Sequence, residues 1–593
     1  MASPRPWFRR CMEYLRCDYF VSDSEKDPHS PGTIVKRQPG GWKCMPYIIG
    51  NETFERVASF GLTANFTVYL VNELHMKQVS ATNLANIFSG TTNFAPLLGA
   101  FISDAYWGRF RTLAYSSVAT FLGMVVLTLT AVVPDLRPPE CTQASEQAGL
   151  CTGPSKSQLS VLWISLVLLV IGAGGVRPCS ITFGADQFDP NTEKGRIGMN
   201  SFFNWYYCTS TAAVMVGLTV VVYIQDSISW AIGFGVPTGL MFLAIILFFL
   251  GTRLYIYVPP EGSIFTGVAQ VLTAAFKKRS LKLPAPNNAE EQEGLLYNPT
   301  IRSPRVLKLP LTLQFSGLNK AAIKCEGEVK EDGSIAQPWR LCTVQQVEEV
   351  KCLIRIIPVW ASGIVCFVAL AQQWTFAVLQ SLRMDRHLGP HFQIPPGSLG
   401  AIALLALTLF IPIYDQVLVP VARHFTKHES GITMLQRQGV GMVISAISMV
   451  VAGLIEVKRR NSALAHGGMS PMSVLWLVPQ LVVMGVAEAF NAVGQIEFYN
   501  RQFPEHMQTL ATSLFNCSLA GANYMSTVLV VIIKNNTSWI QDDINAARVE
   551  NFYYIIAILG VVNFVYFLVV AHFYRYKGMP EYKKNDGELQ SLP

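Results

Sequence analysis

Twelve apolar stretches constrain this chain more than any other feature. They cover residues 45–74, 81–105, 110–133, 158–182, 199–224, 228–251, 348–376, 397–420, 433–457, 471–499, 507–533 and 551–574. A helix of about 20 apolar residues spans the hydrocarbon core of a bilayer. With 14% charged residues in 593, the chain also lacks the charges that a soluble protein of this size needs for its surface. We therefore predict an all-α polytopic membrane protein with twelve transmembrane helices.

The stretches form two groups of six, separated by a long polar interval. This spacing predicts a cytosolic N-terminal tail (1–42), a six-helix bundle (43–257), a cytosolic linker (258–346), a second six-helix bundle (347–575) and a cytosolic C-terminal tail (576–593). In the linker, Gly262–Phe276 has apolar residues at helical spacing and is followed by three basic residues, which predicts an amphipathic helix along the inner leaflet. Lys and Arg concentrate in the inside segments, except for Lys458-Arg459-Arg460 on a predicted outside loop.

Several classes of function are disfavoured by what the sequence contains. The net charge of +7 is modest and not interleaved with aromatic residues, so nucleic acid is not an expected partner. A Walker A motif is absent, which argues against an ATP-driven pump. No metal-ligand spacing is evident among six histidines that lie mostly in loops, so we expect no metal, no cofactor and no enzymatic activity. They are His75, His387, His391, His424, His428 and His466.

Two predictions concern covalent modification outside the membrane. Cys141 and Cys151 share the predicted outside loop after the third helix, where either a disulfide or two free thiols is compatible with the sequence. Asn535 and Asn536 begin two overlapping glycosylation sequons on the last predicted outside loop.

The first apolar stretch carries charges near its start. Glu52, Glu55 and Arg56, hereafter the charged trio, lie within about one helical turn, and Glu52 precedes Arg56 at the spacing that favours an ion pair. Charges inside a bilayer are expensive unless paired or hydrated, and by default they mark an ion or substrate path. The alternative is an ion pair that only fixes packing. If the trio faces a cavity, an acid that loses its arginine partner takes up a proton, because burial disfavours an unpaired carboxylate.

Further motifs carry a resemblance to a known family. Besides the trio, they are Asp104–Thr112, Gly172–Cys179, Phe183–Asp189, Ser201–Tyr207, Val347–Lys351 and Gln495–Phe498. From Gly41 to about Lys577, the chain resembles the proton-coupled oligopeptide transporter family of the major facilitator superfamily, and in particular its plant nitrate/peptide transporters, nearest a branch with phloem nitrate and glucosinolate carriers. The resemblance implies two six-helix bundles with the major facilitator fold, and proton-coupled symport by alternating access.

The resemblance also suggests roles for individual residues. It implies that Arg177 faces the central cavity and forms a salt bridge between the bundles with Glu488; the sequence alone also allows Arg177 to reach the cytoplasmic headgroups. Thr112 matches a position that a regulatory kinase phosphorylates in a family member.

The cargo is less constrained by the sequence than the mechanism. Ser59 and Phe60 replace two tyrosines of the peptide-carrying relatives, and Leu370 replaces the histidine that holds nitrate in one relative. The candidate cavity-lining residues are Ser59, Phe60, Tyr206, Tyr207, Leu370 and Trp374. We rank nitrate first, followed by glycosylated or anionic metabolites such as glucosinolates, or hormones, and then a nitrate sensor with little transport. The expected location is the plasma membrane, with the vacuolar membrane as the alternative.

Overall fold

The protein is described here by a computed structural model of the chain. The described residues are 40–139, 141, 152–189, 192–258, 264–281, 283, 295–299, 309–312, 314–330, 333–390, 392–427, 431–503, 508–541, 543–574 and 576. Both predicted tails lie almost entirely outside these ranges.

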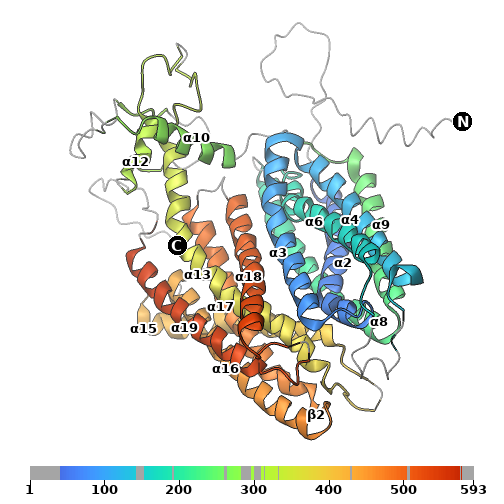
Figure 1. The fold of residues 1–593 in the computed structure, drawn as a ribbon. Coiled ribbons are helices and arrows are strands. Elements are labelled where there is room, and N and C mark those ends of the chain that lie inside the picture. Colours follow the sequence, from blue (N-terminus) through green and yellow to red (C-terminus); the bar gives the residue numbers. More distant parts are fainter. Residues whose placement is uncertain are drawn as a thin grey trace, which may run out of the picture.

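The N-terminal half is a bundle of long helices, drawn in blue to green in Figure 1. Its elements are α2 (Met45–Asn72), α3 (Gln78–Ile102), α4 (Arg109–Val132), α6 (Lys156–Ala185), α7 (Glu193–Val216), α8 (Val222–Ser227) and α9 (Trp230–Leu250). Two short π-helical segments extend these helices: η2 (Ser103–Trp107) follows α3, and η4 (Gly217–Val221) joins α7 to α8. Helix α6 begins with a capping box in which Ser155 and Gln158 satisfy each other's backbone amides.

The C-terminal half is a second bundle, drawn in yellow to red. Its elements are α13 (Val344–Ser381), β1 (Met384–Asp385), η7 (Pro396–Leu399), α14 (Gly400–Ile413), η8 (Tyr414–Leu418), α15 (Val419–Thr426), α16 (Met434–Ala465), β2 (Ser470–Ser473), η9 (Val474–Leu477), α17 (Val478–Gln502), α18 (Gln508–Asn536) and α19 (Val549–Phe573). The two short strands pair in parallel, with Met384 opposite Ser470. Capping boxes at Thr343 and Thr433 begin α13 and α16.

The predicted all-helical polytopic fold is confirmed. Within the described ranges, ten helices are long and apolar enough to cross a membrane. Helices α2 and α3, with 28 and 25 residues, are also long but are not among these ten. Helix α2 carries the charged trio within its span.

The linker folds onto the C-terminal half instead of forming a bare connection. Its helix α10 (Ile264–Lys277) packs with α12 (Ser316–Asn319) and η6 (Lys320–Ala322) on the start of α13 (Figure 1). Thr312 is held by two buried charges of α13. Its amide and hydroxyl donate to Glu348 at 2.9 and 2.8 Å, and its carbonyl accepts from Lys351 at 2.7 Å. These bonds anchor the linker to the C-terminal half, while Phe265 of α10 also meets Phe101 of α3 in the N-terminal half, with ring centroids 6.1 Å apart.

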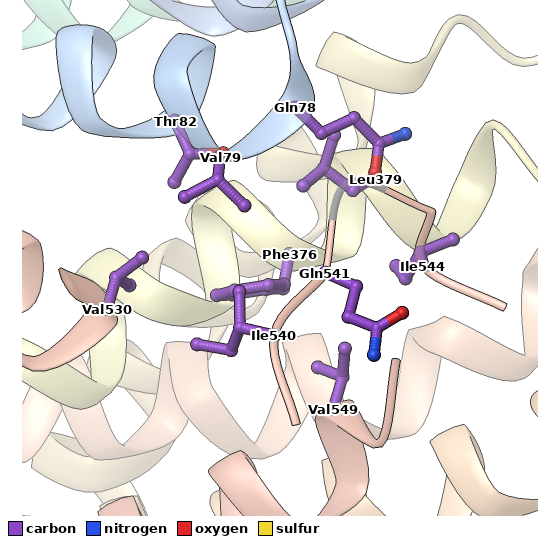
Figure 2. Close-up of a pocket in the computed structure, with 10 residues that line it drawn as sticks. All are labelled: Gln78, Val79, Thr82, Phe376, Leu379, Val530, Ile540, Gln541, Ile544 and Val549. Carbon is purple, nitrogen blue, oxygen red and sulfur yellow. The ribbon is translucent and has the colours of Figure 1, made fainter. Parts of the chain in front are cut away.

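The halves meet firmly at the end remote from the linker. There Arg386, after β1, pairs with Asp226 of α8 at 3.0 Å, and Phe392 stacks on Tyr223 with ring centroids 5.8 Å apart. An apolar seam continues this contact in Figure 2, where Val79 of α3 faces side chains of α13, α18 and the α18–α19 connection. This end of the molecule is closed between the halves.

Close helix packing in the N-terminal half depends on small residues. Helix α3 approaches α6 so closely that a Cβ on Gly99 would overlap the Gly174 carbonyl oxygen. We expect Gly99→Ala to lower stability by about 1–3 kcal/mol, because the helices must separate. Gly239→Ala in α9 is the matched control, since a Cβ there meets no neighbouring atom. The melting temperature of each purified variant can be measured from the fraction that stays monodisperse after heating. Equal melting temperatures for Gly99→Ala and Gly239→Ala would contradict the expected loss of stability.

Candidate functional site

The charged trio forms a connected group on α2. Arg56 Nε donates to Glu52 Oε1 at 2.7 Å, and the Ser59 hydroxyl donates to Glu55 Oε1 at 2.5 Å. The second carboxylate oxygen of each acid is buried and has no hydrogen-bond partner among the described residues. Arg56 therefore donates a hydrogen bond to one carboxylate oxygen of Glu52, and the neutral Ser59 hydroxyl donates one to a single carboxylate oxygen of Glu55.

The trio lies at the border between a buried and an accessible face of α2. Both acids are buried, whereas the Arg56 side chain keeps 23% of its surface exposed. The accessible face continues through Phe60 to Thr63, and the next residue, Ala64, contacts Gly397 of the C-terminal half. Because residues at this spacing share one face of a helix, Arg56 is directed toward the other half of the molecule.

Arg177 of α6 also belongs to this site. It interacts electrostatically with Glu55, and its Nη1 donates to Asn93 of α3 at 3.2 Å. Its Nε is buried without a hydrogen-bond partner in the described part of the chain. A second cation with spare donor capacity therefore stands beside the two acids, and no sequence pattern indicates Asn93 as its hydrogen-bond partner.

The expected salt bridge between Arg177 and Glu488 is not formed in this structure. Glu488 lies partly exposed on α17 and has no ion-pair or hydrogen-bond partner among the described side chains. Since the halves are joined at the end remote from the linker, the bridge stays a prediction for the state in which the linker end closes.

The aromatic candidates separate into two groups. Tyr207 of α7 is 62% exposed and interacts electrostatically with Arg56. Tyr206 does not reach an accessible surface in this structure, and its role as a cavity-lining residue stays a prediction. Its side chain is 3% exposed because it points into the core of the N-terminal half, where it meets Phe202.

Two further candidates belong to α13. Leu370 is partly buried against the core of the C-terminal half, and Trp374 packs close to Gly400 at the start of α14. Both therefore lie in the opposite half from the charged trio. Their role as cavity-lining residues stays a prediction.

The candidate modification sites differ in accessibility. The Thr112 side chain is buried and its hydroxyl donates to the Gly108 carbonyl at 3.0 Å, so phosphorylation would require the start of α4 to open. Cys141 is disulfide-bonded, while Cys151 lies outside the described residues, so their pairing stays a prediction. Asn535 and Asn536 are exposed at the end of α18, as glycosylation would require.

Comparison with known proteins decides the family. The family model described as "PTR2: POT family" matches residues 110–546. The chain belongs to the POT family. This POT family member is 52% identical to "Protein NRT1/ PTR FAMILY 2.13" of Arabidopsis thaliana, over 94% of this chain and 92% of the relative. It is 48% identical to "Protein NRT1/ PTR FAMILY 2.12" of the same plant, over 92% and 94%.

Solved structures of POT transporters share the fold. The crystal structure of an auto-inhibited POT family peptide transporter aligns with a TM-score of 0.67 at 21% identity, covering 91% of this chain and 98% of that one. The transporter PepTSo aligns with a TM-score of 0.65 at 20% identity, over 90% and 98%. This chain is therefore a proton-coupled membrane transporter of the POT family and not an enzyme.

Proposed function

We propose that this POT transporter is a symporter that works by alternating access between its two halves and that carries nitrate across the plasma membrane. The observation that carries the proposal is the charged trio itself. Arg56 pairs with one of two buried acids, Glu52, and it is the member of the trio directed toward the other half. An arginine in this position can exchange its carboxylate partner for an incoming anion.

The exchange provides a route for coupling. When an anion draws Arg56 away from Glu52, the local negative charge is no longer balanced, and a buried carboxylate without a cation favours its protonated form. Proton and anion then enter together, and a second proton must accompany each monovalent anion for the cycle to move net positive charge into the cell. When the transporter opens to the other side of the membrane, Arg56 pairs with Glu52 again, and the proton and the anion leave. The protonmotive drive is adequate, at roughly 1.4 kcal/mol per pH unit plus about 2.3 kcal/mol per charge for each 100 mV.

Charge and size favour a small anion as the cargo. Arg56 and Arg177 act on the same pair of acids, so protonation of one acid leaves the group with a net positive charge. An anion restores neutrality. Arg177 has a free Nε donor for it, and a planar anion with several oxygens matches the fork of donors on a guanidinium.

The exposed ring of Tyr207 on α7 favours a second candidate, a glycosylated anionic metabolite of the glucosinolate kind. Tyr207 is largely accessible and interacts electrostatically with Arg56 of the trio. Sugar rings and aglycones stack on such surfaces, so this cargo would use the same arginines for its anionic group.

Voltage-clamped oocytes that express the protein test the cargo and the direction of coupling. We expect nitrate to evoke an inward current that is several-fold larger at an outside pH of about 5.5 than at about 7.5, because the inward proton gradient adds roughly 1.4 kcal/mol per unit. A glucosinolate-evoked current without a nitrate current would reassign the cargo. Nitrate binding without current or uptake would identify a sensor. A current that does not depend on outside pH would contradict symport with protons.

A further inference from the structure

The Tyr206 hydroxyl lies directly behind the charged trio. Tyr206 belongs to α7, and its ring is fixed in the aromatic core of the N-terminal half against Phe202. Its hydroxyl lies next to the Glu52 carboxylate of α2 and the Ser180 hydroxyl of α6. Tyr207, the next residue, points away from the core and is mostly exposed. Only the first of these two adjacent tyrosines therefore reaches the buried side of Glu52.

Three buried oxygens at this point have unused hydrogen-bonding capacity. They are Glu52 Oε2, Tyr206 Oη and Ser180 Oγ, and each lacks a hydrogen-bond partner among the described residues. Buried polar atoms in native proteins almost always have partners. Because Glu52 uses its other oxygen for Arg56, the free oxygen and the phenol are placed to interact when that ion pair changes.

We propose that Tyr206 is a positioning residue for proton coupling: when Arg56 leaves Glu52, the Tyr206 hydroxyl donates a hydrogen bond to the Glu52 carboxylate, so that Glu52 stays ionised and Glu55 takes the proton. This inference rests on the proposed exchange of Arg56 between acid and cargo. It assigns different tasks to two acids that are one helical turn apart and that the sequence does not distinguish.

The surroundings of the two acids support this division. Arg56 of α2 and Arg177 of α6 interact electrostatically with both acids. The acids differ in the hydroxyl beside each of them: the Tyr206 phenol lies beside Glu52, whereas the Ser59 hydroxyl donates to Glu55. A hydroxyl can accept from a protonated acid as well as donate to an ionised one, so Glu55 keeps its partner in either state. A phenol held beside a carboxylate forms a strong charge-assisted hydrogen bond.

The test is Tyr206→Phe, which keeps the buried ring and removes only the hydroxyl. Without this donor, an unpaired Glu52 holds a proton more readily, so the outside pH of half-maximal substrate-evoked current should rise by about one unit. Tyr207→Phe is the matched control and should leave the midpoint unchanged. A role in packing alone would reduce the current through lower surface abundance without moving its pH midpoint, and that result would overturn the proposal.

A second variant covers the case in which Tyr206→Phe does not reach the membrane. Glu52→Gln should retain an acid-stimulated current, because Glu55 still takes the proton; loss of acid stimulation in this variant overturns the division of tasks. If wild-type protein shows no acid stimulation with nitrate, a glucosinolate or a dipeptide, the proposed function fails together with this inference. Normal acid stimulation with an unshifted Tyr206→Phe profile removes this inference alone.

Discussion

Glu456→Ala is expected to destabilise the folded protein by about 3–5 kcal/mol, the range found when a buried ion pair loses one partner. Glu456 accepts from Arg459 Nε at 2.7 Å and from its Nη2 at 2.8 Å, and neither side chain has any exposed surface. Without the carboxylate, the buried Arg459 charge keeps, among the described residues, only the Asn545 amide oxygen, at 2.9 Å, as a hydrogen-bond partner.

The melting temperature of the purified protein measures this effect. Glu73→Ala is the matched control, because Glu73, just after α2, pairs with Arg137 at 3.2 Å while both side chains stay partly exposed, and such pairs contribute about 0–1 kcal/mol. A much larger loss of stability in Glu456→Ala than in Glu73→Ala is expected. Similar melting temperatures would show that water reaches Arg459 and that its ion pair contributes little.

Glu55→Gln is expected to abolish the acid stimulation of substrate-evoked current while the protein stays at the cell surface. Glutamine keeps the size of the side chain and its hydrogen bond with Ser59, but it can neither take up nor release a proton. The group of two arginines and two acids then has a fixed charge, and a change in outside pH no longer alters its affinity for an anion.

The control for this prediction lies on the same stretch of chain. Glu73, just after α2, pairs with Arg137 at 3.2 Å near the end of the helix remote from the trio. Glu73→Gln removes an acid in the same way and should leave the pH dependence intact. If Glu55→Gln and wild type respond identically to outside pH, another group carries the proton.

The positions of the membrane helices could be predicted because each depends on its own apolar run. The residues at which the helices end could not be predicted in this way. Residues Lys458 to Arg460 were expected on an outside loop, yet α16 continues to Ala465 and encloses Arg459. The spacing of Glu456 and Arg459 was a local signal for this helical continuation. The partner Asn545 lies far away in the sequence and gave no such signal.

The linker shows the same limit. Glu348 and Lys351 were noted only as part of a family motif, but both are buried because Thr312 of the linker lies against them. A contact between residues so far apart in the chain has no trace in periodicity or composition. The amphipathic pattern of α10 was sufficient to predict a helix, but not the face of it that packs on α13.

The candidate site could be predicted in part. The spacing of Glu52 and Arg56 on one helix face was enough to predict their ion pair, which the structure contains. The different surroundings of Tyr206 and Tyr207 could not be predicted, because adjacent helical residues of the same type differ only in the neighbours that tertiary packing gives them. The partners Asn93 and Ser180 were missed for the same reason.

Transport by purified protein in liposomes tests the central claim, that the charged trio exchanges its ion pair for a proton, most directly. Wild type should accumulate nitrate when the outside is acidic and should also exchange internal for external nitrate without any gradient. Glu55→Gln should retain the exchange and lose the acid-driven accumulation. Accumulation equal to that of wild type in Glu55→Gln would contradict the claim.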